Sequence, residues 1–123
     1  MLQMKKIKKI IKKRYQNFIF FRNSIKKKMW KPNINKSSII SNMGYPIISK
    51  DKNKIIKRLD QKKIECRPIV SGSLKRQPFF RNHSLNKNKL PNAEIVHKYG
   101  FYLPNHYFIS KTDIRRMIKE IES

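Results

Sequence analysis

The side chains best suited to binding a ligand crowd into one stretch of the sequence, from Glu65 to Phe80. Pro68 fixes φ and has no N–H for a sheet ladder, so its strand must lie at a sheet edge or end there. In the turn Ser71–Ser73, the central glycine permits positive φ, and the hydroxyls and amides can hold an anion or a sugar. Two more polar residues follow a later apolar strand and are predicted to join the same rim. The predicted polar rim consists of Arg67, Ser71, Gly72, Ser73, Gln77, Asn105 and His106.

Other kinds of chemistry have little support in the residue types and spacing. The alternative for the same stretch is an ordinary exit from a strand into a loop, with Arg67 in solvent. The three histidines show no metal-ligand spacing. Cys66 is the single cysteine, which excludes an internal disulfide. Cys66 could act as a nucleophile with His106 as its base only if the two side chains are in contact, which a sequence does not reveal. Because phosphate loops, serine elbows and paired acids are also missing from the sequence, we expect no catalytic residue and no metal ligand.

The charge balance is extreme, with 31 basic and seven acidic side chains and a net charge of +24. Such a field attracts nucleic acid or an anionic membrane surface without sequence preference. Most of the basic residues are lysines, which AT-rich coding also favours, whereas base and phosphate readers tend to use arginine. A small basic nucleic-acid-binding or ribosome-associated protein therefore stays as the alternative function.

The first thirty residues form one predicted amphipathic helix, from Leu2 to about Met29, which Pro32 ends. Its apolar stripe recurs at steps of four and seven and consists of Ile7, Ile11, Phe18, Ile25 and Met29. The basic opposite face also fits an organelle transit peptide or a membrane-surface helix, but a packed helix with solvated lysines is favoured. No apolar run is long enough to cross a membrane and no secretory signal is visible, which predicts a cytoplasmic protein.

The rest of the chain alternates short strands and helices, which predicts a mixed α/β (α+β) fold in which helices cover a small sheet. We divide the chain into a connecting helix, 1–30, and a small domain, 31–123. Ser110 and Asp113 fit a capping box at the start of the last helix. Packing in the core is the simplest explanation for the later aromatic residues. The predicted elements are strands at Ile39–Ile40 and Tyr45–Ile48, a helix from Ser49 or Asp51 to Lys63, a strand at Ile64–Val70, a mobile loop at Arg81–Lys89, a helix at Pro91–Gly100, a strand at Phe101–Pro104 and the last helix from Ser110.

Several blocks in a fixed order resemble the C-terminal part of the DegT/DnrJ/StrS family of pyridoxal-phosphate-dependent enzymes. The resemblance extends from about Leu2 to Ile121, and residues 15–18 and 41–47 add weaker support. Ser73 departs from the pattern, because the sugar-dehydratase-like branch usually has Asn there. The blocks that carry the resemblance are Cys66–Ser73, Arg76–Phe79, Leu90–Ala93 and Gly100–His106.

This resemblance implies the small domain of a fold-type-I enzyme that acts on nucleotide-linked keto sugars, either as an aminotransferase or as a dehydratase, with an amino donor as co-substrate. The cofactor lysine of such an enzyme lies in a large N-terminal domain, which is absent here. We therefore expect no pyridoxal phosphate to be held by this chain alone, and a separately made N-terminal half or a homodimer as partner. The resemblance implies that Arg67 contacts the sugar or a phosphate, that Ser71, Gly72 and Ser73 give loop hydrogen bonds, and that Asn105 and His106 line the rim.

Overall fold

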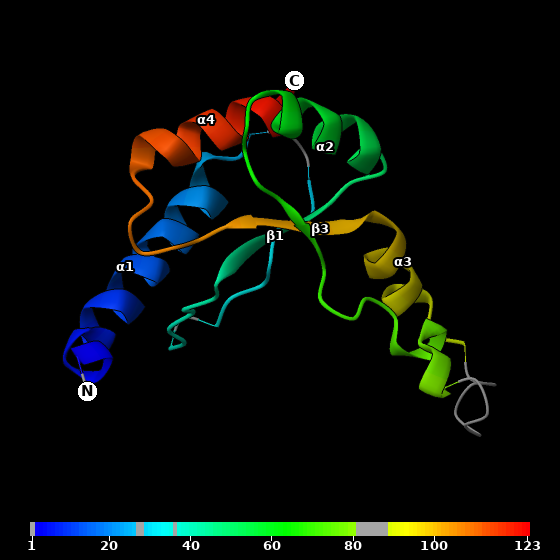
Figure 1. Ribbon diagram of the computed structural model, residues 1–123, viewed down its shortest axis with the longest axis horizontal. Helices are drawn as coiled ribbons and strands as arrows, with labels where there is room; N and C mark the ends of the chain where they lie inside the picture. The colour runs from blue at the N-terminus through cyan, green and yellow to red at the C-terminus, as the bar shows by residue number, and fades with distance from the viewer. Residues whose placement is uncertain (1, 27–28, 36, 81–88) are drawn as a thin grey trace.

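The computed structural model describes residues 2–26, 29–35, 37–80 and 89–123. Helices and strands alternate along these residues, as predicted, and Figure 1 shows their arrangement. The predicted loop Arg81–Lys89 lies almost wholly outside the described residues. The elements are α1 Leu2–Ser24, β1 Gly44–Ile48, α2 Lys52–Gln61, β2 Arg67–Pro68, the 3-10 turns η1 Leu74–Arg76 and η2 Pro78–Phe80, α3 Pro91–Tyr99, β3 Gly100–Pro104 and α4 Lys111–Glu122.

The sheet has three antiparallel strands in the order β1-β3-β2. β1 is therefore an edge strand, as predicted for the strand that contains Pro46. An edge strand tolerates proline, because proline has no N–H to donate to a second neighbouring strand. The predicted strand Ile64–Val70 is wrong in length: only Arg67 and Pro68 pair with β3. Pro68 has no N–H to extend the ladder. The predicted strand at Ile39–Ile40 is also wrong, because these residues lie in the loop before β1.

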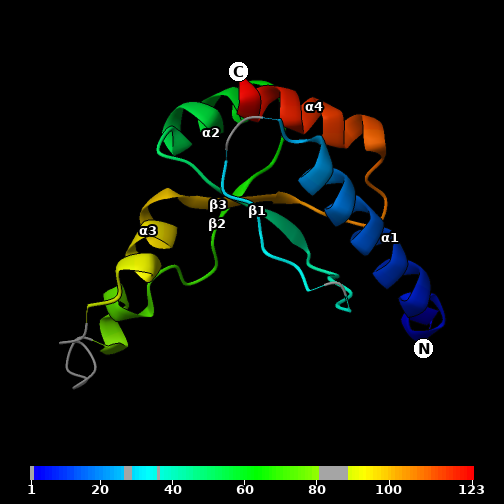
Figure 2. The same cartoon turned by 180° about the vertical axis from the view of Figure 1, so that it is seen from behind.

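One face of the sheet carries the core. Side chains alternate between the two faces of a strand, and the buried ones on β1 and β3 pack with α1, α2 and α4. The rings of Phe18 and Phe21 on α1 lie 5.1 and 4.9 Å from the ring of Tyr45. In Figures 1 and 2, α2 and α4 lie above the sheet, while the loop leading into β1 lies below it. The mixed fold in which helices cover a small sheet is confirmed.

The first helix ends at Ser24, well before the predicted end at Met29. The chain turns there because Ile25 is already buried and the Lys31 ammonium donates to its carbonyl over 2.7 Å, a common way to satisfy the last carbonyls of a helix. The predicted apolar stripe divides in two. Its second half is in the core, whereas Ile7 and Ile11 are 44% and 37% exposed. The first half of α1 thus carries an uncovered apolar stripe.

Asp51 is the N-cap of α2, as one of the two predicted starts has it, although its side chain makes no cap hydrogen bond; Ser49 Oγ accepts from the Asp51 N–H. One other local prediction needs correction. Core packing does not explain all the later aromatics, since Phe79 is 71% exposed while Phe101 is fully buried. Phe79 lies in η2, whose described residues include no buried side chain.

The capping box at α4 is confirmed and gives a first test. Ser110 Oγ accepts from the Asp113 N–H, and the Asp113 carboxylate accepts from the Ser110 N–H. The Ser110 hydroxyl also donates to Asp113 Oδ2 over 2.6 Å, and this bond, followed by the bond from the Ser110 N–H, holds the pKa of Asp113 below its ordinary value. We expect Ser110→Ala to lower the free energy of unfolding by about 1 kcal/mol, measured by urea denaturation. A cost near zero would contradict the cap.

The same box predicts a dependence on acid. The pKa of Asp113 is lower in the folded protein than in the unfolded chain. Its contribution to stability is therefore complete above the unfolded value of about 4 and is lost as the pH falls through the folded value. In thermal denaturation across this range, wild type should lose more stability on acidification than Asp113→Asn. Equal losses would contradict the prediction.

Candidate functional site

The turn after β2 has an unusual backbone. Ser71 and Gly72 have φ of 62° and 51°, in the left-handed region that side chains other than glycine rarely adopt. The Gly72 N–H donates to the Ile69 carbonyl over 3.1 Å, which closes the turn. A Cβ at Gly72 would lie 2.3 Å from His97 Nδ1, so α3 approaches this turn as closely as glycine allows. The predicted use of glycine here is confirmed.

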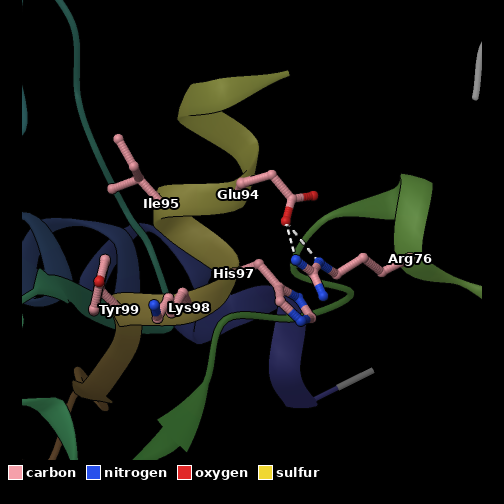
Figure 3. A pocket seen from close by; sticks show the side chains of 6 residues that line it. All are labelled: Arg76, Glu94, Ile95, His97, Lys98 and Tyr99. Atoms are coloured by element: carbon pink, nitrogen blue, oxygen red, sulfur yellow. Dashed lines mark hydrogen bonds and ion pairs between the residues drawn. The ribbon is translucent and has the colours of Figure 1, made fainter. Parts of the chain in front are cut away.

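Two side chains of α3 hold the loop 71–77 (Figure 3). Ser73 is 1% exposed; its Oγ donates to Glu94 Oε1 over 2.8 Å and its N–H donates to His97 Nδ1 over 3.2 Å. Arg76 Nε donates to Glu94 Oε2 over 2.6 Å. Hydrogen bonds from Arg76 and then Ser73 hold the pKa of Glu94 below its ordinary value, so the carboxylate stays ionised. The amides of Gly72 and Ser73, which the sequence suggested as an anion cradle, are thus already used inside the protein.

An open pocket of about 600 Å³ lies between this loop and α3. The ion pair of Arg76 and Glu94 lies at its edge, with oxygen and nitrogen 2.6 Å apart. The charges of Arg76 and Glu94 thus compensate each other. The lining residues are Arg76, Glu94, Ile95, His97, Lys98 and Tyr99 (Figure 3).

A smaller pocket of about 210 Å³ lies beside β2 and the end of β3. It brings together two of the predicted binding residues, Arg67 and His106. Arg67 Nε donates to Glu65 Oε1 over 2.8 Å, and this bond raises the pKa of the exposed guanidinium. The lining residues are Met43, Glu65, Cys66, Arg67, Tyr102, Pro104 and His106.

Cys66 and His106 both line the smaller pocket, which revives the question of a nucleophile and its base. Burial, and secondarily the charges of Asp60 and Glu65, raise the pKa of the Cys66 thiol. A nucleophilic cysteine needs the opposite shift, because the thiolate is the reactive form. The thiol is half-buried and behaves as part of the core cluster rather than as a nucleophile.

The remaining predicted residues lie elsewhere. Asn105 is fully buried, not on a rim, and its amide donates to the carbonyls of Arg14 and Asn42 over 3.1 and 3.0 Å. Gln77 Nε2 donates to the Ser71 carbonyl over 2.9 Å and so braces the loop. The seven predicted residues thus divide among the smaller pocket, the loop 71–77 and the interior below α1.

Sequence reasoning missed the two α3 side chains that hold the loop. A signal was present: Glu94 precedes His97 by three residues, a spacing that places both on one face of a helix. What the sequence did not show is their contact with Ser73, 21 and 24 residues away along the chain. Within the described residues, no group of three or more His, Cys, Asp or Glu side chains gathers as a metal site would require. No described helix is both long and apolar enough to span a membrane.

The family model for the DegT/DnrJ/EryC1/StrS aminotransferase family matches residues 1–122. The chain belongs to this family. It is 26% identical to the GDP-4-keto-6-deoxy-D-mannose 3-dehydratase of Yersinia pseudotuberculosis over 97% of this chain and 31% of the relative. Its identity to the corresponding enzyme of Escherichia coli O55:H7 is 29%, over 85% of this chain and 29% of that one. The chain therefore spans about a third of the length of these relatives.

Solved structures agree with the family assignment. A DegT DnrJ EryC1 StrS aminotransferase from Brucella abortus superposes with a TM-score of 0.87 at 18% identity, over 97% of this chain and 32% of that one. A GDP-4-keto-6-deoxymannose-3-dehydratase with a trapped PLP-glutamate geminal diamine superposes with a TM-score of 0.73 at 26% identity, over 96% and 32%. The resemblance stated from the sequence motifs is confirmed, and the nucleic-acid alternative gains no support from these matches.

Pyridoxal phosphate is the cofactor of this family. A Schiff-base lysine is activated by burial in an apolar pocket or beside another cation. Every described lysine is exposed or half-buried. The smaller pocket, which holds Arg67, has no lysine among its lining residues. These residues do not fit the cofactor as an attachment site.

Proposed function

We propose that this chain is the small, substrate-facing domain of a pyridoxal-phosphate-dependent enzyme acting on nucleotide-linked keto sugars. In this proposal the domain positions the sugar nucleotide, and the cofactor lysine belongs to a part of the enzyme outside these 123 residues. We expect the enzyme to be in the cytoplasm. The observation that carries the proposal is the pocket with Arg67 and His106, on a chain that belongs to this family over residues 1–122.

The sheet register places this pocket on the face away from the core. Tyr102 is paired with Pro46 on one side and with Arg67 on the other. Directly opposite residues in antiparallel strands share a face, and these three alternate with the buried Phe101 and Leu103. The helices α2 and α4 cover only the core face (Figure 1). On the second face, beside the loop that leads into β1, the pocket leaves part of the sheet open to a substrate.

Arg67 is the residue best placed to hold a phosphate. A guanidinium has five N–H donors in a planar fork, and the contacts with Glu65 use only Nε and one terminal nitrogen. Donors remain for a diphosphate, and the aromatic ring of Tyr102 and the imidazole of His106 line the same pocket. Ser71 and Gln77 would act indirectly, through the loop that they brace.

The uncovered stripe on α1 supports the view that more of the enzyme packs against this domain. Met4, Ile7 and Ile11 are 66%, 44% and 37% exposed. They belong to the same apolar stripe as Phe18, which is buried further along the helix. We propose that this stripe contacts the remainder of the enzyme.

A titration with a nucleotide sugar tests the proposal. The ¹⁵N-labelled chain is titrated with GDP-mannose, followed by amide resonances, in wild type and in two matched variants. We expect saturable shifts around Arg67, Tyr102 and His106. Arg67→Gln should weaken binding about tenfold or more, since a hydrogen bond to a charged group contributes about 1.5–3 kcal/mol.

Arg116→Gln is the matched control, because Arg116 is also exposed but lines neither this pocket nor the one beside α3. It should leave the affinity within about twofold of wild type. Shifts confined to the lysines of α1, or an Arg116→Gln variant that weakens binding as much as Arg67→Gln, would refute the assignment of this pocket.

A further inference from the structure

The loop 71–77 adopts a conformation that its own sequence does not favour. Ser71 has φ of 62°, although a serine has a Cβ and gains nothing from the left-handed region. A backbone of this kind persists only where surrounding contacts over-determine it. Gln77 Nε2 holds the Ser71 carbonyl from within the loop, and two side chains of α3 hold Ser73, the residue that follows the turn.

Glu94 supplies part of this support and does so at any pH near neutrality. Its two carboxylate oxygens accept from Ser73 Oγ and Arg76 Nε. Its pKa lies below the ordinary value because of these bonds. Glu94 therefore remains an acceptor while other groups around it change their charge.

His97 supplies the remaining support, and only in one protonation state. Its Nδ1 accepts the backbone N–H of Ser73 over 3.2 Å. An imidazole nitrogen that accepts a hydrogen bond carries no proton, so a neutral His97 has its proton on Nε2. When Nδ1 takes a proton, an N–H meets the N–H of Ser73, and the bond is replaced by repulsion.

The turn lies close against the imidazole ring. A Cβ at Gly72 would lie 2.3 Å from Nδ1 and 3.2 Å from the next ring atom, which shows how closely the turn is seated on the imidazole. The charged and titratable groups around the ring are Glu94 and Lys98 on α3, Tyr99 at its end, and Arg76 on η1. The two cations have no lone pair with which to accept the Ser73 N–H in place of Nδ1, and the Glu94 oxygens already accept from Ser73 Oγ and Arg76 Nε.

We propose that His97 is a positioning residue whose neutral imidazole pins the loop 71–77, and that protonation of its ring releases the loop from α3. The inference goes beyond the proposed function, because the loop 71–77 contributes no residue to the pocket that holds Arg67. The geometry of the pin itself does not depend on the identity of the ligand.

The test follows the NMR signals of two residues, His97 and Ser73, in the 123-residue chain without any ligand. Histidine is the residue type that changes charge between about pH 5 and pH 8. Over this range, the chemical shifts of the His97 ring nitrogens report which nitrogen carries the proton. The chemical shift of the Ser73 amide reports its hydrogen bond to His97 Nδ1. We expect the proton on Nε2 at the alkaline end, and a Ser73 amide shift with the same midpoint as the His97 ring. At the alkaline end, His97→Ala should lower the hydrogen-exchange protection of the Ser73 amide about tenfold.

His97→Gln separates the pin from simple packing, because glutamine offers an acceptor that does not titrate. In this variant the Ser73 amide should no longer respond to pH. His106→Gln removes a histidine from the other pocket and should leave the Ser73 titration unchanged. If His97→Ala does not fold, the wild type and His97→Gln still decide the question.

The proposal is overturned if the Ser73 amide stays still while the His97 ring titrates, or if it still titrates in His97→Gln. Either result is independent of nucleotide-sugar binding. A pin without sugar binding would reject the proposed function alone, and sugar binding without a pin would reject this inference alone.

Discussion

Replacing Phe101 with alanine is expected to lower the free energy of unfolding by about 3–5 kcal/mol. Phe101 is fully buried at the centre of the sheet, on β3, which pairs with both other strands. Its ring contributes to the cluster that joins the sheet to α1, α2 and α4. The total stability of a domain of this size is on the order of 10 kcal/mol, so this one ring accounts for a large share.

Phe108→Ala is the matched control, because Phe108 is 75% exposed. It should change the free energy of unfolding by less than about 0.5 kcal/mol. Urea denaturation followed by circular dichroism measures both variants. Similar losses in the two variants would contradict the placement of β3 at the centre of the core.

Asn105→Ala is the second large effect, expected at about 2–4 kcal/mol of lost stability. The Asn105 side chain is fully buried and its amide donates to two backbone carbonyls, those of Arg14 and Asn42. Each buried group left without its partner costs about 1–3 kcal/mol. The bonds join α1 and the loop before β1 to the end of β3, so their loss should loosen α1 as well.

His106→Ala tests the neighbouring position in the same experiment. His106 is exposed and lines the smaller pocket. We expect this substitution to change the free energy of unfolding by less than about 0.5 kcal/mol. If Asn105→Ala proved as stable as His106→Ala, the assignment of Asn105 to the interior would fail.

Local signals predicted the helices well. The last helix begins at Ser110 with its capping box because cap and helix are neighbours in sequence. The end of α1 was predicted too late, because the apolar period continues to Met29 while the chain turns after Ser24. That turn depends on a bond from Lys31 to the Ile25 carbonyl, which no periodicity encodes.

The sheet and the candidate site depended on contacts that local reasoning does not reach. The short β2 follows from its pairing with Tyr102 and Phe101, more than thirty residues later. The same pairing brings Arg67 and His106 to one pocket. The loop 71–77 was recognised by its glycine and serines, but its support by Glu94 and His97 comes from a separate helix. Residue type therefore predicted which segments matter, whereas the partners of each side chain required the fold.

The central claim is that this chain presents a substrate face but does not hold the cofactor. Borohydride reduction after adding one equivalent of pyridoxal phosphate, followed by peptide mapping, tests it most directly. We expect the adduct to be spread over many lysines, because every described lysine is exposed or half-buried. A near-stoichiometric adduct on one lysine, with an aldimine absorbance band that survives dialysis, would contradict the claim.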